Sequence, residues 1–192
     1  MTAPEAAANH ETPSSGGDAG GSGSARVEEQ PADVSRKEEL RVVMGCFATG
    51  AAIITAVLDD EPHGLVVNSF TSVSLDPPLI LFCPGKSSAT WPAIETAGQF
   101  VVNILAADQE TLCRKFSKKG EDRFSDGTHA MSDDGGLILD DIVAFLWCRV
   151  EQVHDAGDHF ITVGRVLDLG LKRDVSPLVF YKGAYHNLAG FD

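Results

Sequence analysis

The apolar positions of this chain fall mostly into short runs that are typical of β-strands. Four of them are "AAIITAVL" (51–58), "HGLVVNSF" (63–70), "LILFC" (79–83) and "QFVVNIL" (99–105). They are rich in β-branched and aromatic residues, and turn residues such as "DDEPHG" and "LDPP" separate them. Two longer runs flank a short "DAGD" turn, which predicts an antiparallel hairpin, and "PLVFYKGAYHNL" adds a last strand and turn.

Helical spacing is found in two places. Ser35 and Glu38 form a capping box that predicts a helix start, and Gly50 is the predicted stop. Between them, one apolar stripe recurs at Leu40, Val43, Met44 and Phe47. A second short helix is predicted in "ADQETLCRKF" (107–116), whereas the Gly- and Asp-rich stretch 119–136 is interpreted as a long surface loop.

Many closely spaced strands with two or three helices predict a mainly β fold, a closed β-barrel decorated by helices. There is no repeated βαβ alternation and no G-x-G-x-x-G after a strand, which excludes a Rossmann domain. We expect one folded domain over residues 35–190. Residues 1–34 almost lack large apolar side chains and have a net charge of −5, from six acidic residues and one basic, so a disordered acidic tail is predicted there.

Bulk properties narrow the function. The net charge of the 192-residue chain is −13, which argues against nucleic acid as a partner because that binding needs clustered Lys and Arg. No stretch approaches a membrane span, and no secretory signal begins the chain. The cysteines form no C-x-x-C pair, so we interpret them as reduced and structural, in a cytoplasmic protein; they are Cys46, Cys83, Cys113 and Cys148.

The stretch "CPGKSSATW" (83–91) carries the first candidate chemistry. Its "GKS" resembles the end of a P-loop, but Ile80 stands where that pattern needs glycine, so an NTPase is excluded. One cation and three hydroxyls gather where a strand ends and a helix begins, at Lys86, Ser87, Ser88 and Thr90. Helix N-termini favour anions, and we therefore predict a phosphate site here. The alternative is that Ser88 only caps the helix.

Two further segments hold polar groups. "VNSFTSVSLDPP" (67–78) supplies small hydroxyl and amide side chains, which either bind a ligand or serve an edge strand and turn. His159 follows the "DAGD" turn beside Asp158 and is a candidate site residue, although a lone histidine is more often structural. His154 could join them around a metal, but no third histidine or cysteine has clear ligand spacing, and no metal is predicted.

A fourth group is aromatic and basic. The segments "FSKKGEDRFSD" and "YKGAY" could form a lid and an aromatic wall, or equally ordinary surface and core. The residues concerned are Phe116, Arg123, Phe124, Tyr181 and Tyr185. The sequence alone does not decide between the two.

Taken in order, these strings resemble the flavin reductase family, which has a split β-barrel FMN-binding fold and supplies the reductase components of two-component monooxygenases. The matching strings are "VMGCFATGAAIITA", "GLVVNSFTSVSLDPPLILFC", "KSSATW", "GQFVVNIL", "DRF", "GDHFITVGRV" and "PLVFYKGAY". The resemblance implies a homodimer with flavin bound near the dimer interface. It also implies a separate flavin-dependent monooxygenase that receives the reduced flavin.

The resemblance also implies roles for individual residues. Contacts with the isoalloxazine ring and ribityl chain fall to Asn68, Ser69, Phe70, Thr71 and Ser72. Contacts around the phosphate fall to Cys83, Lys86, Ser87, Ser88 and Thr90. His159 would orient the nicotinamide for hydride transfer, with Tyr185 also against the nicotinamide. The expected cofactors are FMN or FAD with NADH or NADPH. The alternative function is a tight flavin-binding electron-transfer module without nicotinamide-dependent turnover.

Overall fold

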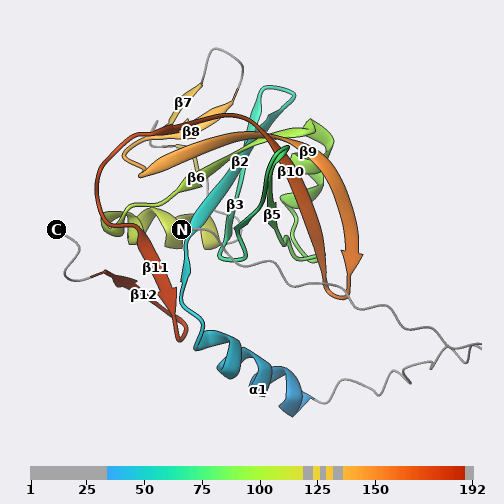
Figure 1. Ribbon diagram of the computed structural model, residues 1–192, viewed down its shortest axis with the longest axis vertical. Helices are drawn as coiled ribbons and strands as arrows, with labels where there is room; N and C mark the ends of the chain where they lie inside the picture. Colours follow the sequence, from blue (N-terminus) through green and yellow to red (C-terminus); the bar gives the residue numbers. More distant parts are fainter. Residues whose placement is uncertain (1–33, 119–122, 126–128, 132–135, 189–192) are drawn as a thin grey trace, which may run out of the picture.

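The structure is a computed structural model that describes residues 34–118, 123–125, 129–131 and 136–188. Figure 1 shows strands forming most of this part of the chain, with a few short helices around them. The mainly β class predicted from the sequence is confirmed. The predicted tail lies outside the described residues, apart from Val34, where the first helix begins.

One antiparallel sheet of seven strands forms the body of the molecule. Its strands are β2 (Ala52–Leu58), β3 (Glu61–Val67), β4 (Thr71–Leu75), β5 (Pro78–Phe82), β6 (Gln99–Ile104), β9 (Ala144–Ala156) and β10 (His159–Leu171). They lie in the order β3-β2-β6-β9-β10-β5-β4. The four short runs predicted as strands are confirmed as β2, β3, β5 and β6, and the predicted hairpin is confirmed as β9–β10.

Residues 67–78 were interpreted as a strand end followed by a turn, with an edge strand as one of the alternatives, and the structure has an edge strand there, β4. The chain reverses at Asp76-Pro77, and β4 pairs with β5 from Thr71↔Leu81 to Leu75↔Pro78. An edge strand is hydrogen-bonded to a neighbouring strand on one side only, and most residues of β4 are exposed. A strand of this kind lacks the buried alternate positions by which sequence patterns identify strands.

Two small sheets complete the strands. One has the order β1-β11-β12, and the other pairs β7 with β8. Their strands are β1 (Thr49–Gly50), β7 (His129–Met131), β8 (Leu137–Leu139), β11 (Leu178–Tyr181) and β12 (Ala184–Asn187). The interpretation of 119–136 as a loop was therefore wrong at β7. Within that stretch, 119–122, 126–128 and 132–135 lie outside the described residues.

The helices are α1 (Val34–Gly45), α2 (Trp91–Ala97) and α3 (Glu110–Ser117), with a 3-10 turn η1 (Ala107–Gln109) before α3. None of them has the length and apolar character needed to cross a membrane in the described part of the chain. The helix predicted within 107–116 is confirmed by η1 and α3. The predicted ends of the first helix were wrong: Ser35 lies inside α1, and Gly50 belongs to β1. Helix α1 ends at Gly45, whose carbonyl oxygen accepts a hydrogen bond from Lys182 N at 2.9 Å.

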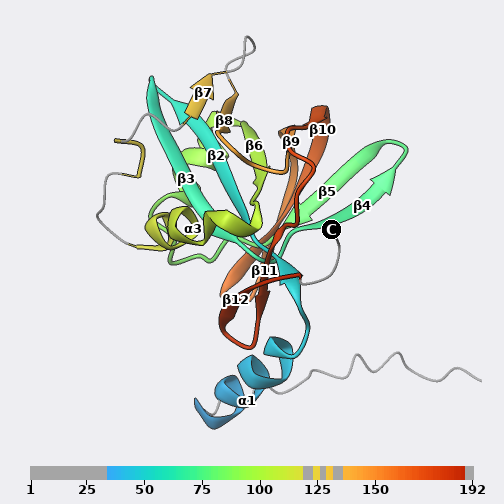
Figure 2. The same ribbon diagram turned by 90° about the vertical axis from the view of Figure 1, so that its left-hand side faces the viewer.

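The predicted closure of the strands into a barrel was also wrong. The seven-stranded sheet ends at β3 on one side and β4 on the other, and these two strands do not pair within the described residues. Figure 2 shows the β4–β5 hairpin diverging from the rest of the sheet. The β9–β10 ladder has irregularities at Val163/Gly164 and Val166/Asp168, and such bulges bend and twist strands. The sheet is thus curled but open.

Two apolar clusters form the core. In the first, the Phe82 ring meets the rings of Trp91 and Phe100 edge-on, at centroid distances of 5.7 and 5.2 Å. Phe70 and Phe160 pack against this cluster from its margin. The second cluster lies around β2, α3, β8 and β11. The first cluster is the one that supports the predicted flavin segments.

Candidate functional site

Two segments far apart in the sequence meet beside strand β10. Strand β5 pairs with β10 through Phe82↔Thr162, so the residues that follow β5 run along those that precede Thr162. Lys86 N donates to Asp158 O, and Phe160 N donates to Pro84 O, both at 2.9 Å. Gly85 and His159 form an isolated bridge. The loop after β5 (83–88) carries the predicted phosphate site and is called the phosphate loop below. Backbone hydrogen bonds therefore join it to the β9–β10 turn.

The segment before β4 joins the same surface. Cys83 N donates to Ser69 Oγ at 2.9 Å, which ties the β3–β4 connection to the end of β5. Asn68, Thr71 and Ser72 are exposed, whereas Ser69 is half-buried. The structure thus brings together the three segments to which the sequence assigned flavin and nicotinamide contacts: 68–72, 83–88 and the turn before His159.

The imidazole of His159 is half exposed and fixed at one nitrogen. Its Nδ1 lies 2.7 Å from Asp158 Oδ1, and this hydrogen bond lowers the pKa of the Asp158 carboxyl. A Cβ atom built on Gly85 would lie 3.6 Å from His159 Nε2. The opposite edge of the ring therefore faces the backbone of the phosphate loop, and the glycine keeps the space beside that nitrogen open.

Lys86, the only charged side chain among the predicted phosphate donors, already has partners. Its Nζ lies 2.6 Å from Asp155 Oδ2 and 5.4 Å from the centre of the Phe160 ring. Sequence reasoning missed Asp155 and Phe160. The predicted "DAGD" turn included Asp155, whereas the structure pairs Asp155 with Phe160 directly across the hairpin, in the register Phe160↔Asp155.

The remaining loop hydroxyls differ in their use. Ser88 Oγ accepts from the N–H groups of Thr90 and Trp91, at 3.3 and 3.2 Å, so it satisfies two backbone donors at the start of α2, whose N-cap residue is Thr90. Thr90 Oγ1 accepts from Arg123 Nη1 at 3.1 Å, and the same nitrogen donates to Gly64 O at 2.6 Å. Ser87 is exposed. Arg123, one of the basic candidates, thus fixes the start of α2 to strand β3.

Tyr185 lies elsewhere in the chain. Its hydroxyl accepts a hydrogen bond from Cys113 Sγ at 3.2 Å, and its ring packs on Phe180 and the second core cluster. Burial, together with the neighbouring Cys113 thiol, raises the pKa of Tyr185 to about 12. Figure 1 shows the β11–β12 hairpin on the opposite side of the molecule from the β9–β10 turn. One chain therefore does not bring Tyr185 and His159 together.

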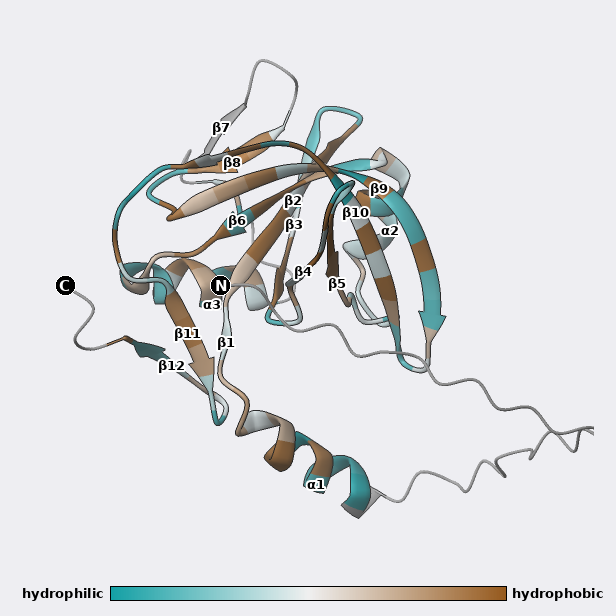
Figure 3. Ribbon diagram, viewed as in Figure 1, coloured by the Kyte–Doolittle hydropathy of each residue, from teal (hydrophilic) through white to brown (hydrophobic). Residues whose placement is uncertain are grey.

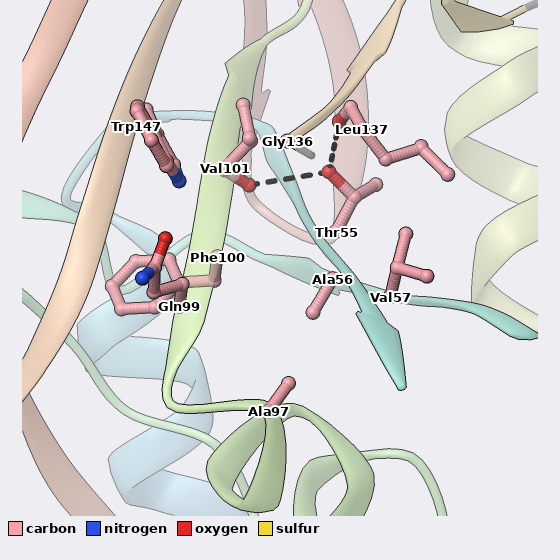
Figure 4. A pocket seen from close by; sticks show the side chains of 10 residues that line it. All are labelled: Thr55, Ala56, Val57, Ala97, Gln99, Phe100, Val101, Gly136, Leu137 and Trp147. Carbon is pink, nitrogen blue, oxygen red and sulfur yellow. Dashed lines mark hydrogen bonds between the residues drawn. The ribbon is translucent and has the colours of Figure 1, made fainter. Parts of the chain in front are cut away.

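Two pockets in the described part of the chain are both smaller than a usual ligand site. The first, about 170 Å³, lies over β2, β6 and β8 with Trp147 and Gln99 on its wall (Figure 4). The second, about 230 Å³, adjoins Arg123 and contains Thr90 as its single predicted flavin residue. Pockets that enclose a small-molecule ligand usually measure about 300 Å³ or more. Neither of these pockets is lined by residues 68–72 or 83–88, and Asn68, Thr71, Ser72 and Ser87 of the candidate flavin surface are exposed.

Other chemistry finds little support. Among the described residues, no three His, Cys, Asp or Glu side chains are placed to hold a metal ion, and His154 Nε2 lies 3.1 Å from Gln152 Oε1. The four cysteines are unpaired in the chain. Burial raises the pKa of Cys148 to about 12, which keeps that thiol neutral and inert. The polar surface beside β10 is the strongest candidate site.

A family model described as "Flavin reductase like domain" matches residues 44–189. The chain therefore belongs to the flavin reductase family. A flavin reductase from Pseudomonas putida is 43% identical over 150 residues, which cover 78% of this chain and 88% of that protein. The reductase subunit HsaB of a flavin-dependent monooxygenase from Rhodococcus jostii is 44% identical, over 76% of this chain and 74% of its own. The FMN reductase (NADH) SmoA of Agrobacterium fabrum is 43% identical, over 76% and 82%.

Solved structures agree in fold. Nitrilotriacetate monooxygenase component B from Mycobacterium thermoresistibile superimposes with a TM-score of 0.78 at 42% identity, covering 82% of this chain and 89% of that one. The NADH:FAD oxidoreductase SgcE6 of Streptomyces globisporus, in complex with NAD and FAD fragments, gives a TM-score of 0.78 at 31% identity, covering 84% and 98%. The resemblance identified from the sequence strings is confirmed.

Proposed function

We propose that this protein is an NAD(P)H:flavin oxidoreductase that supplies reduced flavin to a separate flavin-dependent monooxygenase. The proposal is supported by the backbone hydrogen bonds that join residues 83–88, the proposed phosphate loop, to the β9–β10 turn that leads into His159. Family membership supports it, since named relatives are an NADH-dependent FMN reductase and a monooxygenase reductase subunit.

The donor groups on this surface suit FMN, or the corresponding half of FAD. Exposed hydroxyls of Thr71, Ser72 and Ser87 and the Lys86 ammonium can donate to ribityl oxygens and a phosphate. Asn68, Ser69 and Phe70 would contact the ring system, with Cys83, Ser88 and Thr90 shaping the loop around the phosphate. When bound, flavin supplies the chemistry of accepting a hydride from reduced nicotinamide.

His159 has the role of orienting the nicotinamide. One nitrogen is held by Asp158, so the ring is fixed in position while half of it stays open to a ligand. The protein contributes proximity and alignment, and no group of the chain needs to exchange a proton with the substrates. We take NADH as the preferred donor, in line with SmoA and SgcE6.

We also propose that the working form is a homodimer that closes the flavin surface. Four residues on and after α1 are between 57% and 70% exposed, although all are large and apolar: Leu40, Val43, Met44 and Phe47. Figure 3 shows apolar segments along α1, which projects from the body of the molecule. Further exposed apolar side chains lie on β4 and at the end of β10. Apolar surfaces of this extent are typical of protein interfaces.

The charge of α1 suits a second copy of the chain. The helix has three basic and two acidic side chains, a net charge of 3 − 2 = +1, whereas the whole chain has −13. Met44→Glu should convert dimers to monomers, because it buries a charge in the interface. Sedimentation velocity measures this, with Glu95→Gln at an exposed position of α2 as control. A wild-type protein that sediments as a monomer would overturn the proposal.

The domain boundaries and the compartment complete the proposal. We assign residues 35–190 to one flavin-reductase domain and residues 1–34 to an extension outside it. The unpaired cysteines suit a reducing compartment, and on that basis we place the enzyme in the cytoplasm.

The test of the activity is NADH and NADPH oxidation by the purified protein with and without added FMN, FAD or riboflavin. We expect rapid NADH oxidation that depends on the added flavin, and flavin that separates from the protein on gel filtration. A protein that binds flavin but oxidises neither nucleotide with any flavin would instead be the electron-transfer module.

A further inference from the structure

The Lys86–Asp155 ion pair lies where a flavin phosphate is proposed to bind. Lys86 Nζ and Asp155 Oδ2 are 2.6 Å apart, and the two side chains are 35% and 72% exposed. The pair is therefore reachable from solvent on the carboxylate side. A phosphate that approaches Lys86 meets an ammonium group that already has an anionic partner.

The backbone keeps both members of the pair in place. Lys86 N–H is bonded to Asp158 O, and the Lys86 ammonium lies over the Phe160 ring. Asp155 faces Phe160 across the hairpin in register. Both charges thus remain near each other whether or not the ion pair is formed, so the carboxylate stays close to any anion that Lys86 binds.

The other polar groups of the turn have separate partners. The Asp158 carboxylate bonds to His159 Nδ1, and the Ser88 hydroxyl accepts from the N–H groups of Thr90 and Trp91 at the start of α2. Lys86 is the positive charge that lies on the proposed phosphate loop itself, and its partner carboxylate is exposed. Exposed ion pairs contribute little free energy, so a dianionic phosphate can replace a single carboxylate.

We infer that Asp155 competes with the flavin phosphate for the Lys86 ammonium and thereby keeps the affinity for phosphorylated flavins low. The inference rests on the proposed function and deepens it, because a reductase that hands its flavin to another enzyme must release it. Asp155 is a positioning residue in this scheme, since it acts through Lys86 and does not itself hold the flavin.

The test is the dissociation constant of FMN and of riboflavin for the wild type and for Asp155→Asn, measured by equilibrium dialysis. Riboflavin has the same ring and ribityl chain without the phosphate. We expect the Kd of FMN to fall about two- to fivefold in Asp155→Asn, the range that an exposed ion pair can supply, while the Kd of riboflavin stays unchanged. A merely structural role of Asp155 would move both constants together.

Two further variants sharpen the measurement. Lys86→Met keeps an aliphatic side chain over Phe160 but removes the charge, so adding Asp155→Asn to it should no longer improve FMN binding. Glu110→Gln removes a carboxylate from an ion pair within α3, on the far side of the sheet from β4 and β5 (Figure 2), and should leave both constants unchanged. These variants separate the Lys86 pair from a general loss of negative charge.

Each outcome decides the inference. An equal gain in FMN affinity with and without the Lys86 charge, or an equal change for riboflavin, would overturn it. So would an unchanged FMN constant in Asp155→Asn. The proposed function fails separately, if the wild-type protein binds neither flavin or if it binds flavin but oxidises neither NADH nor NADPH.

Discussion

Two polar contacts of this molecule differ in their exposure to solvent. One is buried between β2 and β6, and the other is at the surface beside the β9–β10 turn. Thr55 and Asn103 are fully buried, and their side chains bond to each other at 2.9 Å. Lys86 and Asp155 form a single contact at the surface. A buried polar group must be completely satisfied, whereas an exposed charge can exchange its partner with water or a ligand. The first contact therefore specifies the fold, and the second is available for binding.

Removing the buried contact should have the largest effect on the protein. Asn103 Nδ2 also donates to Ile53 O at 3.1 Å, and Asn103 Oδ1 accepts from Leu139 N at 2.9 Å. Asn103→Ala leaves the buried Leu139 N–H without a partner, which costs about 2–4 kcal/mol together with the lost bonds. We expect a Tm lower by about 5–15 °C in calorimetry.

The matched control for this variant is Asn187→Ala, at an exposed position of β12, which should leave the Tm nearly unchanged. Flavin affinity at a temperature where Asn103→Ala is folded should match the wild type. If Asn103→Ala lost flavin binding while still folded, the separation between a fold-specifying and a ligand-binding contact would be wrong.

A substitution at the exposed site beside the β9–β10 turn should lower turnover and leave the Tm nearly unchanged. We expect His159→Ala to lower kcat/KM for NADH about ten- to hundredfold, because a positioned nicotinamide accounts for part of the rate and the cofactors still exchange the hydride themselves. His159 is half exposed, so the Tm should stay within about 2 °C of the wild type. Steady-state NADH oxidation at saturating FMN measures the first effect.

His154→Ala is the control, since His154 is an exposed histidine on the neighbouring strand β9. It should change kcat/KM less than about twofold. Equal losses in the two variants would show that His159 has no special position, and a drop in Tm for His159→Ala would place it with the structural contacts.

Sequence patterns predicted the parts of this molecule in which local signals and burial agree. Strands β2 and β6 are buried along most of their length, and their apolar runs were identified correctly. The end of β5 before residue 83 and the turn before His159 were also predicted, whereas Thr71 and Ser72 lie within strand β4. Strand β4 was considered only as an edge-strand alternative, because an exposed edge has no such pattern. Helix α1 was predicted, but its apolar stripe is exposed, since the sequence does not say what covers it.

The partners of the site residues could not be read from local sequence. The loop containing Lys86 meets the β9–β10 turn through the register of β5 against β10, which joins residues about 80 positions apart. The curling of the open sheet likewise involves bulges in β9–β10 that no residue pattern predicted. The partners of the site residues are therefore set by the long-range register of the strands, which local sequence patterns do not show.

The smallest effect is expected where an exposed ion pair supports the fold and binds nothing. The Arg173 guanidinium lies 2.8 Å from the Asp108 carboxylate and also donates to Asp141 O at 2.7 Å. The hydrogen bond from Arg173 lowers the pKa of the Asp108 carboxyl below its ordinary 3.8. A carboxyl whose pKa is lowered by folding contributes stability above its unfolded pKa, and this contribution disappears as the pH falls through the lower folded value. Asp108→Asn should therefore lower the Tm by about 1–3 °C at pH 7 and by less at pH 3, with Asp168→Asn on the exposed part of β10 as control. A Tm difference that stayed constant from pH 7 to pH 3 would show that the loss comes from packing, and that exposed ion pairs in this protein serve binding alone.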